Sequence, residues 1–429
     1  MKNQLAIMSI ILGFTIANLV SCRPEIEWSQ TGNTENEVVS GFITENTTWY
    51  NEVIYELKGR VVVREGATLT IEAGAIIKGQ EGTGTSASVL IVERGAKIDA
   101  QGTVANPIIF TSVLDNIALG ETAGTNLNET QNSLWGGIII LGKAPVSSED
   151  GNTEGQIEGV PANETYGTYG GNDVADNSGT LTYISIRHGG ISIGDGNEIN
   201  GLTLGGVGTG TTIDFVEIVA NLDDGVEFFG GTVNADNIIV VYQGDDAIDI
   251  DQNYSGTINN VMVITGDGIG TDEALEIDGP EGATYTDGLF TITNGTFINE
   301  GTEGSGADFK SKAQGNITNC VWDGYATGIK IRASFSDTIP CTDKTDSYTH
   351  LVTDNTLNFS DIELVSTTVT ASDIANVYTG SCEDCGCVTA TMQADTDTEI
   401  GASVVTSAST GATPAAFSGW TWADEKGKL

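Results

Sequence analysis

The chain has 429 residues, of which 17 are Lys or Arg and 59 are Asp or Glu, so its formal net charge at pH 7 is -42. A surface with this charge repels nucleic acid and anionic membranes, which leaves cations, basic proteins and neutral sugars as partners. The 56 glycines, 7 prolines and 39% hydrophobic residues favour many short strands with tight turns over an acidic disordered chain.

The first 21 residues have the features of an export signal. A lysine precedes the apolar run 5–20, which is short for a membrane-spanning helix, and the small residue Ser21 stands before Cys22. This ending resembles the signal of bacterial lipoproteins, which implies a signal peptide over 1–21 and a lipid on the Cys22 thiol. The alternative is an ordinary cleaved signal with an incidental cysteine. Residues 22–50 are polar without a period and are predicted to be a tether.

Internal repetition dominates residues 51–335. Residues 61–80 and 89–112 both alternate apolar residues, turn at Gly-Ala and continue in another short strand. Further along, the segments GVEFFGG, AIDIDQN, ALEIDGP, ADFKSK and GIKIRAS align, with their first apolar positions 22, 27, 32 and 22 residues apart. This spacing fits one turn of a coil plus loops of variable length, and predicts an all-β fold, a right-handed parallel β-helix.

Alternation within the aligned segments separates an inward face from an outward face. The inward columns are Val226, Ile248, Leu275, Ala307 and Ile329, and Phe228, Ile250, Ile277, Phe309 and Ile331. The outward rows are Glu227, Asp249, Glu276, Asp308 and Lys330, and Phe229, Asp251, Asp278, Lys310 and Arg332.

A second strand precedes each of these segments and carries a recurring asparagine. The aligned residues are Asn237, Asn260, Asn294 and Asn319. Their side-chain amides are predicted to hydrogen-bond from one coil to the next as a ladder, although asparagine also marks turns.

The blocks LTIEAGAIIKG, LWGGIIILGKA and DDGVEFFGGTVNADNI occur in order within residues 50–335. They are similar to a family of secreted or lipid-anchored right-handed parallel β-helix proteins of Gram-negative bacteria. The resemblance implies the β-helix fold and a location at the outer membrane or cell surface, held by the lipid anchor alone. It implies no activity, because the family has no agreed one.

The outward acids raise the question of what neutralises them. Neighbouring coils lie roughly 4.8 Å apart, where two carboxylates repel by about 1 kcal/mol in water and by more at a lower dielectric. Asp249, Asp251, Glu276 and Asp278 form a two-by-two array of the oxygen ligands that Ca²⁺ prefers, which predicts a calcium site there. The alternative is a solvated acidic face that keeps the chain soluble and its strand edges unpaired.

A catalytic interpretation of the same face is the third alternative. QGDDAIDI and GIKIRA resemble segments of polygalacturonase-type glycoside hydrolases, which makes Asp245, Asp246 and Lys330 candidate catalytic residues of a hydrolase or lyase. However, HGGISIG precedes the acidic pair here and follows it in those enzymes, and acidic pairs recur at 223, 245 and 272. With two histidines in the chain, a multi-histidine zinc site is excluded.

Aromatic residues provide candidates for sugar binding. Tyr166 and Tyr169 lie in the glycine-rich stretch ETYGTYGGND and are expected to be exposed. The sequence therefore favours a binding or accessory protein for a polysaccharide or an outer-membrane protein, with calcium as a stabilising ion. A polysaccharide-degrading enzyme is the alternative.

After about residue 335 the repeat loosens. Residues 336–429 are predicted to form the last coils and a cap that closes the open end. In an exported protein, Cys320, Cys341, Cys382, Cys385 and Cys387 are expected to form disulfides, although CEDCGC could bind a metal instead. The final stretch FSGWTWADEKGKL is predicted to be a strand against this cap.

Overall fold

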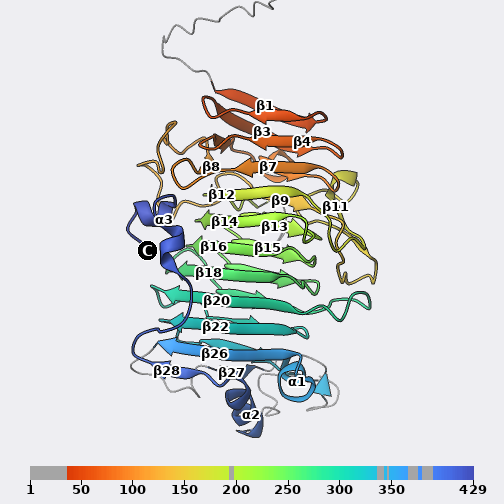
Figure 1. The fold of residues 1–429 in the computed structure, drawn as a ribbon, viewed down its shortest axis with the longest axis vertical. Helices are drawn as coiled ribbons and strands as arrows, with labels where there is room; N and C mark the ends of the chain where they lie inside the picture. Colours follow the sequence, from red (N-terminus) through yellow and green to blue (C-terminus); the bar gives the residue numbers. More distant parts are fainter. Residues whose placement is uncertain (1–35, 193–197, 336–342, 345–346, 366–374, 379–389) are drawn as a thin grey trace, which may run out of the picture. The chain divides into compact units, whose positions relative to one another are not determined.

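Successive turns of the chain stack as parallel strands, from β1 at the N-terminal end to β28 at the C-terminal end (Figure 1). They form a right-handed parallel β-helix, as the sequence predicts. The structure is a computed structural model that describes residues 36–192, 198–335, 343–344, 347–365, 375–378 and 390–429.

In the central part, each coil contributes one long and one short strand, and long strands pair with long, short with short. The long strands are β12 (Gly179–Arg187), β14 (Thr212–Val219), β16 (Ala235–Val241), β18 (Thr257–Thr265), β20 (Phe290–Asn299), β22 (Gly315–Asp323) and β26 (Leu357–Val365). The short strands are β13 (Leu202–Gly205), β15 (Val226–Phe229), β17 (Ile248–Asp251), β19 (Leu275–Ile277), β21 (Asp308–Phe309), β23 (Ile329–Arg332) and β27 (Ala375–Tyr378).

The first coils are less regular, and a small hairpin and short helices complete the fold. The first strands are β1 (Glu37–Ile43), β2 (Thr47–Trp49), β3 (Ile54–Val63), β4 (Thr68–Ile71), β5 (Ile76–Gly79), β6 (Val89–Val92), β7 (Lys97–Gln101), β8 (Ile108–Ser112) and β9 (Ile138–Leu141). The remaining elements are the pair β10 (Glu154–Gln156) and β11 (Thr168–Gly170), the pair β24 (Ser334–Phe335) and β25 (Asp343–Lys344), α1 (Ser347–Thr349), α2 (Ala390–Ile400), β28 (Ser403–Val405) and α3 (Trp422–Glu425).

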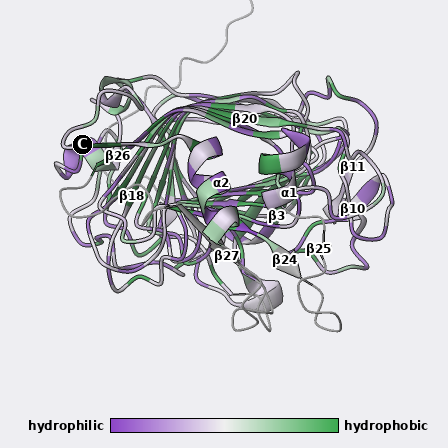
Figure 2. Ribbon diagram, turned by 90° about the horizontal axis from the view of Figure 1, so that it is seen from below, coloured by the Kyte–Doolittle hydropathy of each residue, from purple (hydrophilic) through white to green (hydrophobic). Residues whose placement is uncertain are grey.

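The predicted inward columns form the core. Every residue of the two columns is at most 1% exposed, and they belong to one continuous hydrophobic cluster. The view along the coil shows hydrophobic strands around this core and α1 and α2 across the end of the coil (Figure 2). Burial of stacked aliphatic side chains stabilises each coil against its neighbours, because one coil alone cannot cover its apolar face.

The asparagine ladder is confirmed, and the backbone explains the choice of residue. Asn237, Asn260, Asn294 and Asn319 have φ between 54° and 58°, a left-handed conformation that asparagine tolerates better than most residues. The Asn260 amide donates to Asn237, and the Asn319 amide donates to Asn294. Between these pairs the ladder shifts, since Asn294 donates to Asn259 and the Oδ1 of Asn260 accepts from the backbone of Thr413.

The coil begins earlier than the sequence predicts. Strand β1 pairs in parallel with β3, so the predicted tether over 22–50 is wrong for its last part. The apolar residues of β1 stand in adjacent pairs, Val38 with Val39 and Phe42 with Ile43, so no alternation indicated a strand. Val38 and Phe42 are exposed, at 53% and 57%. The predicted signal peptide and Cys22 lie outside the described residues.

The described part of the C-terminal region contains α2, which packs against β26 and β27 at the end of the coil. Cys320 is a buried free thiol in β22. The predicted disulfide partners Cys341, Cys382, Cys385 and Cys387 lie outside the described residues. Within the described part of the chain, no helix has the length and apolar character needed to cross a membrane.

The last residues do not form the predicted strand. After β28 the chain turns back along the long strands, and α3 lies beside β12, β14 and β16 (Figure 1). We call residues 406–429 the C-terminal strap. The strap docks because Phe417, Trp420 and Trp422 pack on apolar side chains that these strands point outward. The Thr421 side chain accepts a hydrogen bond from Asp424 N, which starts a helix where the alternation suggested a strand.

Candidate functional site

The outward rows have the predicted register. Residues Glu227, Asp249, Glu276, Asp308 and Lys330 occupy equivalent positions of β15, β17, β19, β21 and β23. We call the outward surface of these five strands the acidic face. A face of parallel strands repeats its side chains once per coil, so groups of one kind line up along the coil axis.

The expectation that this face is solvated is wrong. Glu227, Asp249 and Asp308 are only 5%, 7% and 1% exposed. The reason is a second row of acids, from the turn before each short strand, that reaches the same surface. Asp224 and Asp246 of these turns are equally buried, at 7% and 4%. The carboxylates therefore cover one another, and their mutual repulsion is not screened by bulk water.

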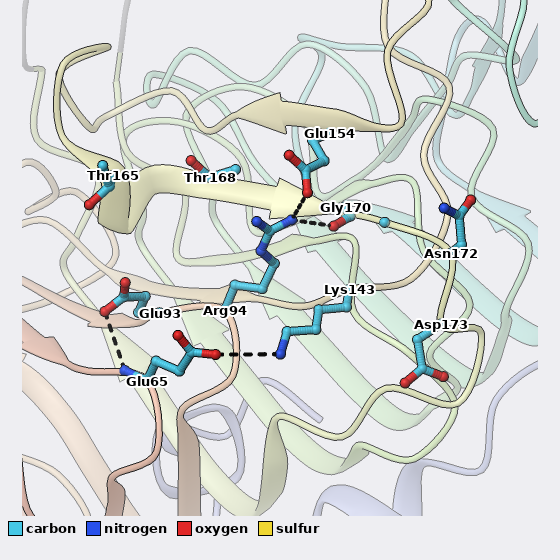
Figure 3. Close-up of a pocket in the computed structure, with 11 residues that line it drawn as sticks. Glu65, Glu93, Arg94, Lys143, Glu154, Thr165, Thr168, Gly170, Asn172 and Asp173 are labelled. Atoms are coloured by element: carbon cyan, nitrogen blue, oxygen red, sulfur yellow. Dashed lines mark hydrogen bonds and ion pairs between the residues drawn. The ribbon is translucent and has the colours of Figure 1, made fainter.

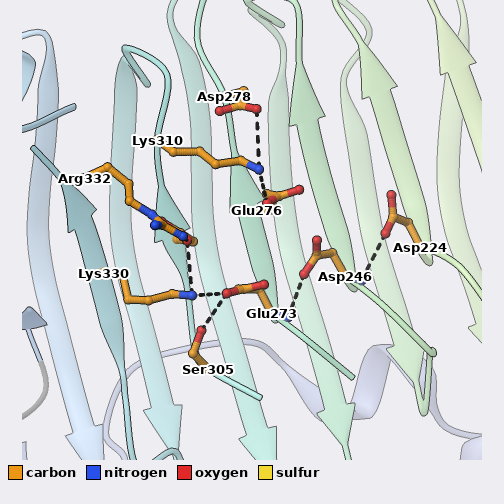
Figure 4. Close-up of polar contacts among 10 residues, drawn as sticks. Asp224, Asp246, Glu273, Glu276, Asp278, Ser305, Lys310, Lys330 and Arg332 are labelled. Atoms are coloured by element: carbon orange, nitrogen blue, oxygen red, sulfur yellow. Dashed lines mark hydrogen bonds and ion pairs between the residues drawn. The ribbon is translucent and has the colours of Figure 1, made fainter. Parts of the chain in front are cut away.

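The turn acids are tied from coil to coil by hydrogen bonds (Figure 4). Asp246 N donates to Asp224 Oδ1 at 3.0 Å, and Glu273 N donates to Asp246 Oδ1 at 2.6 Å. The next coil has Ser305 in this place, and its hydroxyl donates to Glu273 Oε1 at 3.1 Å. Each carboxylate thus receives a donor from the following coil, which fixes the acids in position.

Basic residues occupy the end of the face nearer the C-terminus. Lys330 pairs with Glu273 and lies 3.1 Å from Asp308, which also accepts hydrogen bonds from Arg332. Lys310 pairs with Glu276 and lies 3.8 Å from Asp278. Burial alone would lower the pKa of Lys310 and Lys330, but the neighbouring carboxylates outweigh it and raise both pKa values. These lysines therefore stay charged at neutral pH.

The acids nearer the N-terminal end have strongly perturbed pKa values. Burial first, and then neighbouring carboxylates, raise the pKa of five acids well above its usual range: Asp224, Glu227, Asp246, Asp249 and Asp251. Burial and the Glu158 charge raise the pKa of Asp223 to about 7. Partial burial and the Asp272 charge raise that of Asp245 to about 6. The raised pKa values favour the protonated form of these carboxyls over that of a solvated carboxyl.

Three groups of carboxylates have oxygens within 4.8 Å of one another, as a metal ion would require. They are Asp223, Asp224 and Asp245; Asp224, Glu227 and Asp249; and Asp246, Glu273 and Glu276. The predicted calcium ligands are divided between them, since Asp249 and Glu276 belong to different groups. Asp251 and Asp278 hydrogen-bond to each other and belong to none of the groups found among the described residues.

The candidate catalytic residues are not equally accessible. Asp245 is exposed, whereas Asp246 is buried and accepts its hydrogen bond from Glu273 N. Lys330 is paired with Glu273, which stands between it and Asp246. His188 of HGGISIG is 1% exposed, with Nδ1 2.7 Å from the Gln131 carbonyl oxygen, and burial lowers its pKa to about 4. Only Asp245 of the three candidates could reach a polymer without rearrangement.

The predicted exposure of Tyr166 and Tyr169 is wrong. They are 6% and 2% exposed, because Tyr169 packs on Phe229 and donates to Gln252 at 3.0 Å, while Tyr166 packs edge-on against Phe42. Both tyrosines belong to the loop that carries β10 and β11, and their rings pack into a hydrophobic cluster of buried residues. Neither ring offers a face on which a sugar could stack.

Sequence reasoning missed two polar clefts beside this loop. The larger is about 880 Å³ and has Arg94 and Lys143 among its walls, with Arg94 bound to Glu154 (Figure 3). The smaller is about 540 Å³ and includes Gln252 and Glu281 next to the acidic face. Both volumes are in the range of ligand sites. The loop interrupts the repeat, so no periodic signal marked its walls.

Comparisons with known proteins agree with the architecture. A model of the pectate-lyase-like β-helix domain matches residues 41–423. No curated protein matches the sequence. Among solved structures, the enzymatically active domain of tailspike protein 2 of bacteriophage CBA120 is 10% identical over 76% of this chain and 38% of that chain, with a TM-score of 0.22.

The full-length tailspike protein 2, from an Escherichia coli O157:H7 bacteriophage, is 11% identical over 76% of this chain and 34% of that chain, also with a TM-score of 0.22. This chain thus spans about a third of the tailspike chains, and TM-scores this low carry no argument about its activity. The family match covers nearly all of the stacked coils, so the chain belongs to the pectate-lyase-like β-helix domain family.

Proposed function

We propose that this chain binds a polysaccharide along the acidic face, as a lipoprotein that Cys22 anchors at the outer membrane or cell surface. The supporting observation is the register of the face: equivalent polar groups recur in line on five successive short strands, and Glu276, Lys310 and Arg332 on this face are partly exposed, so a polymer can reach them. A linear polymer of repeating units suits a linear row of repeating donors and acceptors, whereas a compact ligand suits a single pocket.

The charges on the face favour a neutral polymer. Carboxylates dominate, and the lysines and Arg332 are paired with them, so a polyanion would meet net repulsion. Sugar hydroxyls can donate to carboxylates and accept from the lysines. The two clefts beside the loop of β10 and β11 extend this polar surface.

Glu276→Gln combined with Asp278→Asn is expected to weaken binding of a neutral polysaccharide by about tenfold or more, since hydrogen bonds to charged groups contribute about 1.5–3 kcal/mol each. Affinity electrophoresis of the full chain in gels containing individual polysaccharides measures this. Glu399→Gln with Asp287→Asn removes the same two charges at exposed positions outside the five strands of the face and is the matched control. Equal retardation of both variants in every gel would exclude the acidic face as the binding surface.

The anchor has its own test. Cys22→Ser is expected to move the protein from the membrane fraction to the soluble fraction, while its retardation by polysaccharide is unchanged. The alternative partner, an outer-membrane protein, predicts instead that an outer-membrane protein co-purifies with the anchored chain and that no polysaccharide retards it.

A second candidate function, polysaccharide cleavage, has one observation in its favour. Asp223 and Asp245 have oxygens within 4.8 Å of each other and pKa values of about 7 and about 6, so one can be protonated while the other is ionised near neutral pH. A protonated carboxyl can donate to the leaving glycosidic oxygen, and a nearby carboxylate can act as nucleophile or base.

Cleavage predicts that new reducing ends appear when the chain is incubated with a polysaccharide that it binds. Asp245→Asn is expected to lower this rate by a factor of about 100 or more while binding persists, because the acid-base group is removed and the strands are kept. Release at the wild-type rate by Asp245→Asn would rule out this pair, and no release from any bound polymer would leave binding as the function.

A further inference from the structure

Three buried carboxylates at the N-terminal end of the acidic face form no ion pair with any described Lys or Arg. Asp224, Glu227 and Asp249 have oxygens within 4.8 Å of one another and are 7%, 5% and 7% exposed. In the described part of the chain, no Lys or Arg forms an ion pair with any of them. Buried charges are normally paired or bound to a metal, so this group is incompletely neutralised.

The neighbouring group shows how the protein neutralises acids elsewhere on the same face. In the group Asp246, Glu273 and Glu276, Lys330 pairs with Glu273 and Lys310 pairs with Glu276. Asp308, the acid of β21, pairs with Lys330 and Arg332. Among the described residues, the acids at the C-terminal end are thus paired directly with cations, whereas the first group has only the longer-range effect of Lys310 on Asp249.

Two buried oxygen atoms at this group also lack donors. Asp249 Oδ1 is buried and has no hydrogen-bond partner among the described residues. Asn200 is 1% exposed and donates from Nδ2 to Glu227, and its Oδ1 is likewise without a partner in the described ranges. Acceptors without donors are costly to bury, and a cation is the partner that satisfies carboxylate and amide oxygens alike.

We propose that Asp224, Glu227 and Asp249 bind a divalent cation, which would satisfy the buried Asp249 Oδ1. Ca²⁺ fits best by its chemistry, because it accepts several carboxylate oxygens in a flexible geometry. Mg²⁺ demands a near-ideal octahedron and usually keeps several of its waters, which a buried group of carboxylates does not favour. This site takes the place of the four-residue array that the sequence suggested, and it does not rest on polysaccharide binding.

Calorimetric titration of the EDTA-treated, dialysed full chain with CaCl2 tests the site in the absence of any polysaccharide. We expect one ion per chain, with protons released on binding when two buffers of different ionisation enthalpy are compared at pH 6.5. In thermal unfolding at pH 7.5, 1 mM CaCl2 is expected to raise Tm by about 5 °C or more.

Asp249→Asn is expected to abolish both the heat and the Tm shift, and to raise the Tm of the metal-free protein, because it removes one acid from a crowded, buried group. Glu227→Gln provides the same test if Asp249→Asn does not fold. Asp287→Asn, an exposed acid, should titrate like wild type. The proposal is overturned if neither CaCl2 nor MgCl2 gives heat or a Tm shift with the wild type, or if both cluster variants bind calcium as the wild type does.

Discussion

Replacement of Trp420 by alanine is expected to lower the free energy of unfolding by about 3–5 kcal/mol, the usual range for a buried tryptophan. Trp420 is 0% exposed and lies edge-on to the stacked rings of Tyr183 and Phe215, with ring centroids 5.5 and 6.3 Å away. Its Nε1 donates to Ala416 O within the C-terminal strap. Urea denaturation followed by circular dichroism measures the change.

Backbone hydrogen bonds hold the strap in addition to its aromatic rings. Loss of the Trp420 ring is therefore expected to weaken contacts elsewhere along the strap. Glu217, fully buried, accepts from the backbone N–H of Trp422 and Ala423, both at 2.9 Å. Displacement of the strap leaves this carboxylate without those donors. Tyr50→Ala, at a 52% exposed aromatic, is the control and should change stability by less than about 1 kcal/mol. A similar small change for Trp420→Ala would mean that the strap is not docked as described.

Metal-free protein is expected to become less stable as the pH rises from 5 to 8, with Tm lower at pH 8 by about 5–10 °C. The pKa values of Asp245, Asp223 and Glu158 are raised to about 6, 7 and 7, mainly by burial. A carboxyl whose folded-state pKa is raised binds more protons in the folded than in the unfolded chain between the two pKa values. The free energy of unfolding is therefore highest near the ordinary pKa of a carboxyl and falls as the pH rises through the raised folded-state pKa.

Scanning calorimetry in EDTA at several pH values measures this trend. Glu227→Gln supplies the matched comparison, since it removes one buried acid and should flatten the loss between pH 5 and 8. Addition of calcium should flatten it as well, because an ion takes the place of the protons. Stability that rises steadily from pH 5 to 8 without metal would show that the acids on this face are ionised and solvated.

Much of the fold could be predicted from the sequence because it follows from two regularities: the alternation of side chains along each strand and the spacing between successive coils. Alternation along Ile248 to Asp251 determined which side chains point inward, and the spacing of 22 to 32 residues determined which strands lie side by side. The asparagine ladder also follows from this alignment. The inward columns, the strand pairing and the ladder depend only on contacts between neighbouring coils, and the sequence pattern of one coil recurs in the next.

The site was less predictable because its properties come from contacts between unlike elements. Asp249 lies close to Asp224 of a preceding turn, and a loop brings Glu158 close to Glu227. That loop occurs once in the chain, so no repeat in the sequence indicated that its Tyr169 would be buried. The C-terminal strap contacts β14 from about 200 positions away through Glu217, and alternation of aromatic residues there resembled a strand.

Carboxyls on the outward face of the coil are buried together, and we expect them to keep protons at neutral pH unless a cation replaces them. Potentiometric titration of the folded, metal-free chain and of the same chain in urea measures this. Several more protons should dissociate between pH 5.5 and 8 from the folded chain than from the unfolded chain. Titration curves that coincide over that interval would show that the carboxyls are solvated and ionised in the folded chain.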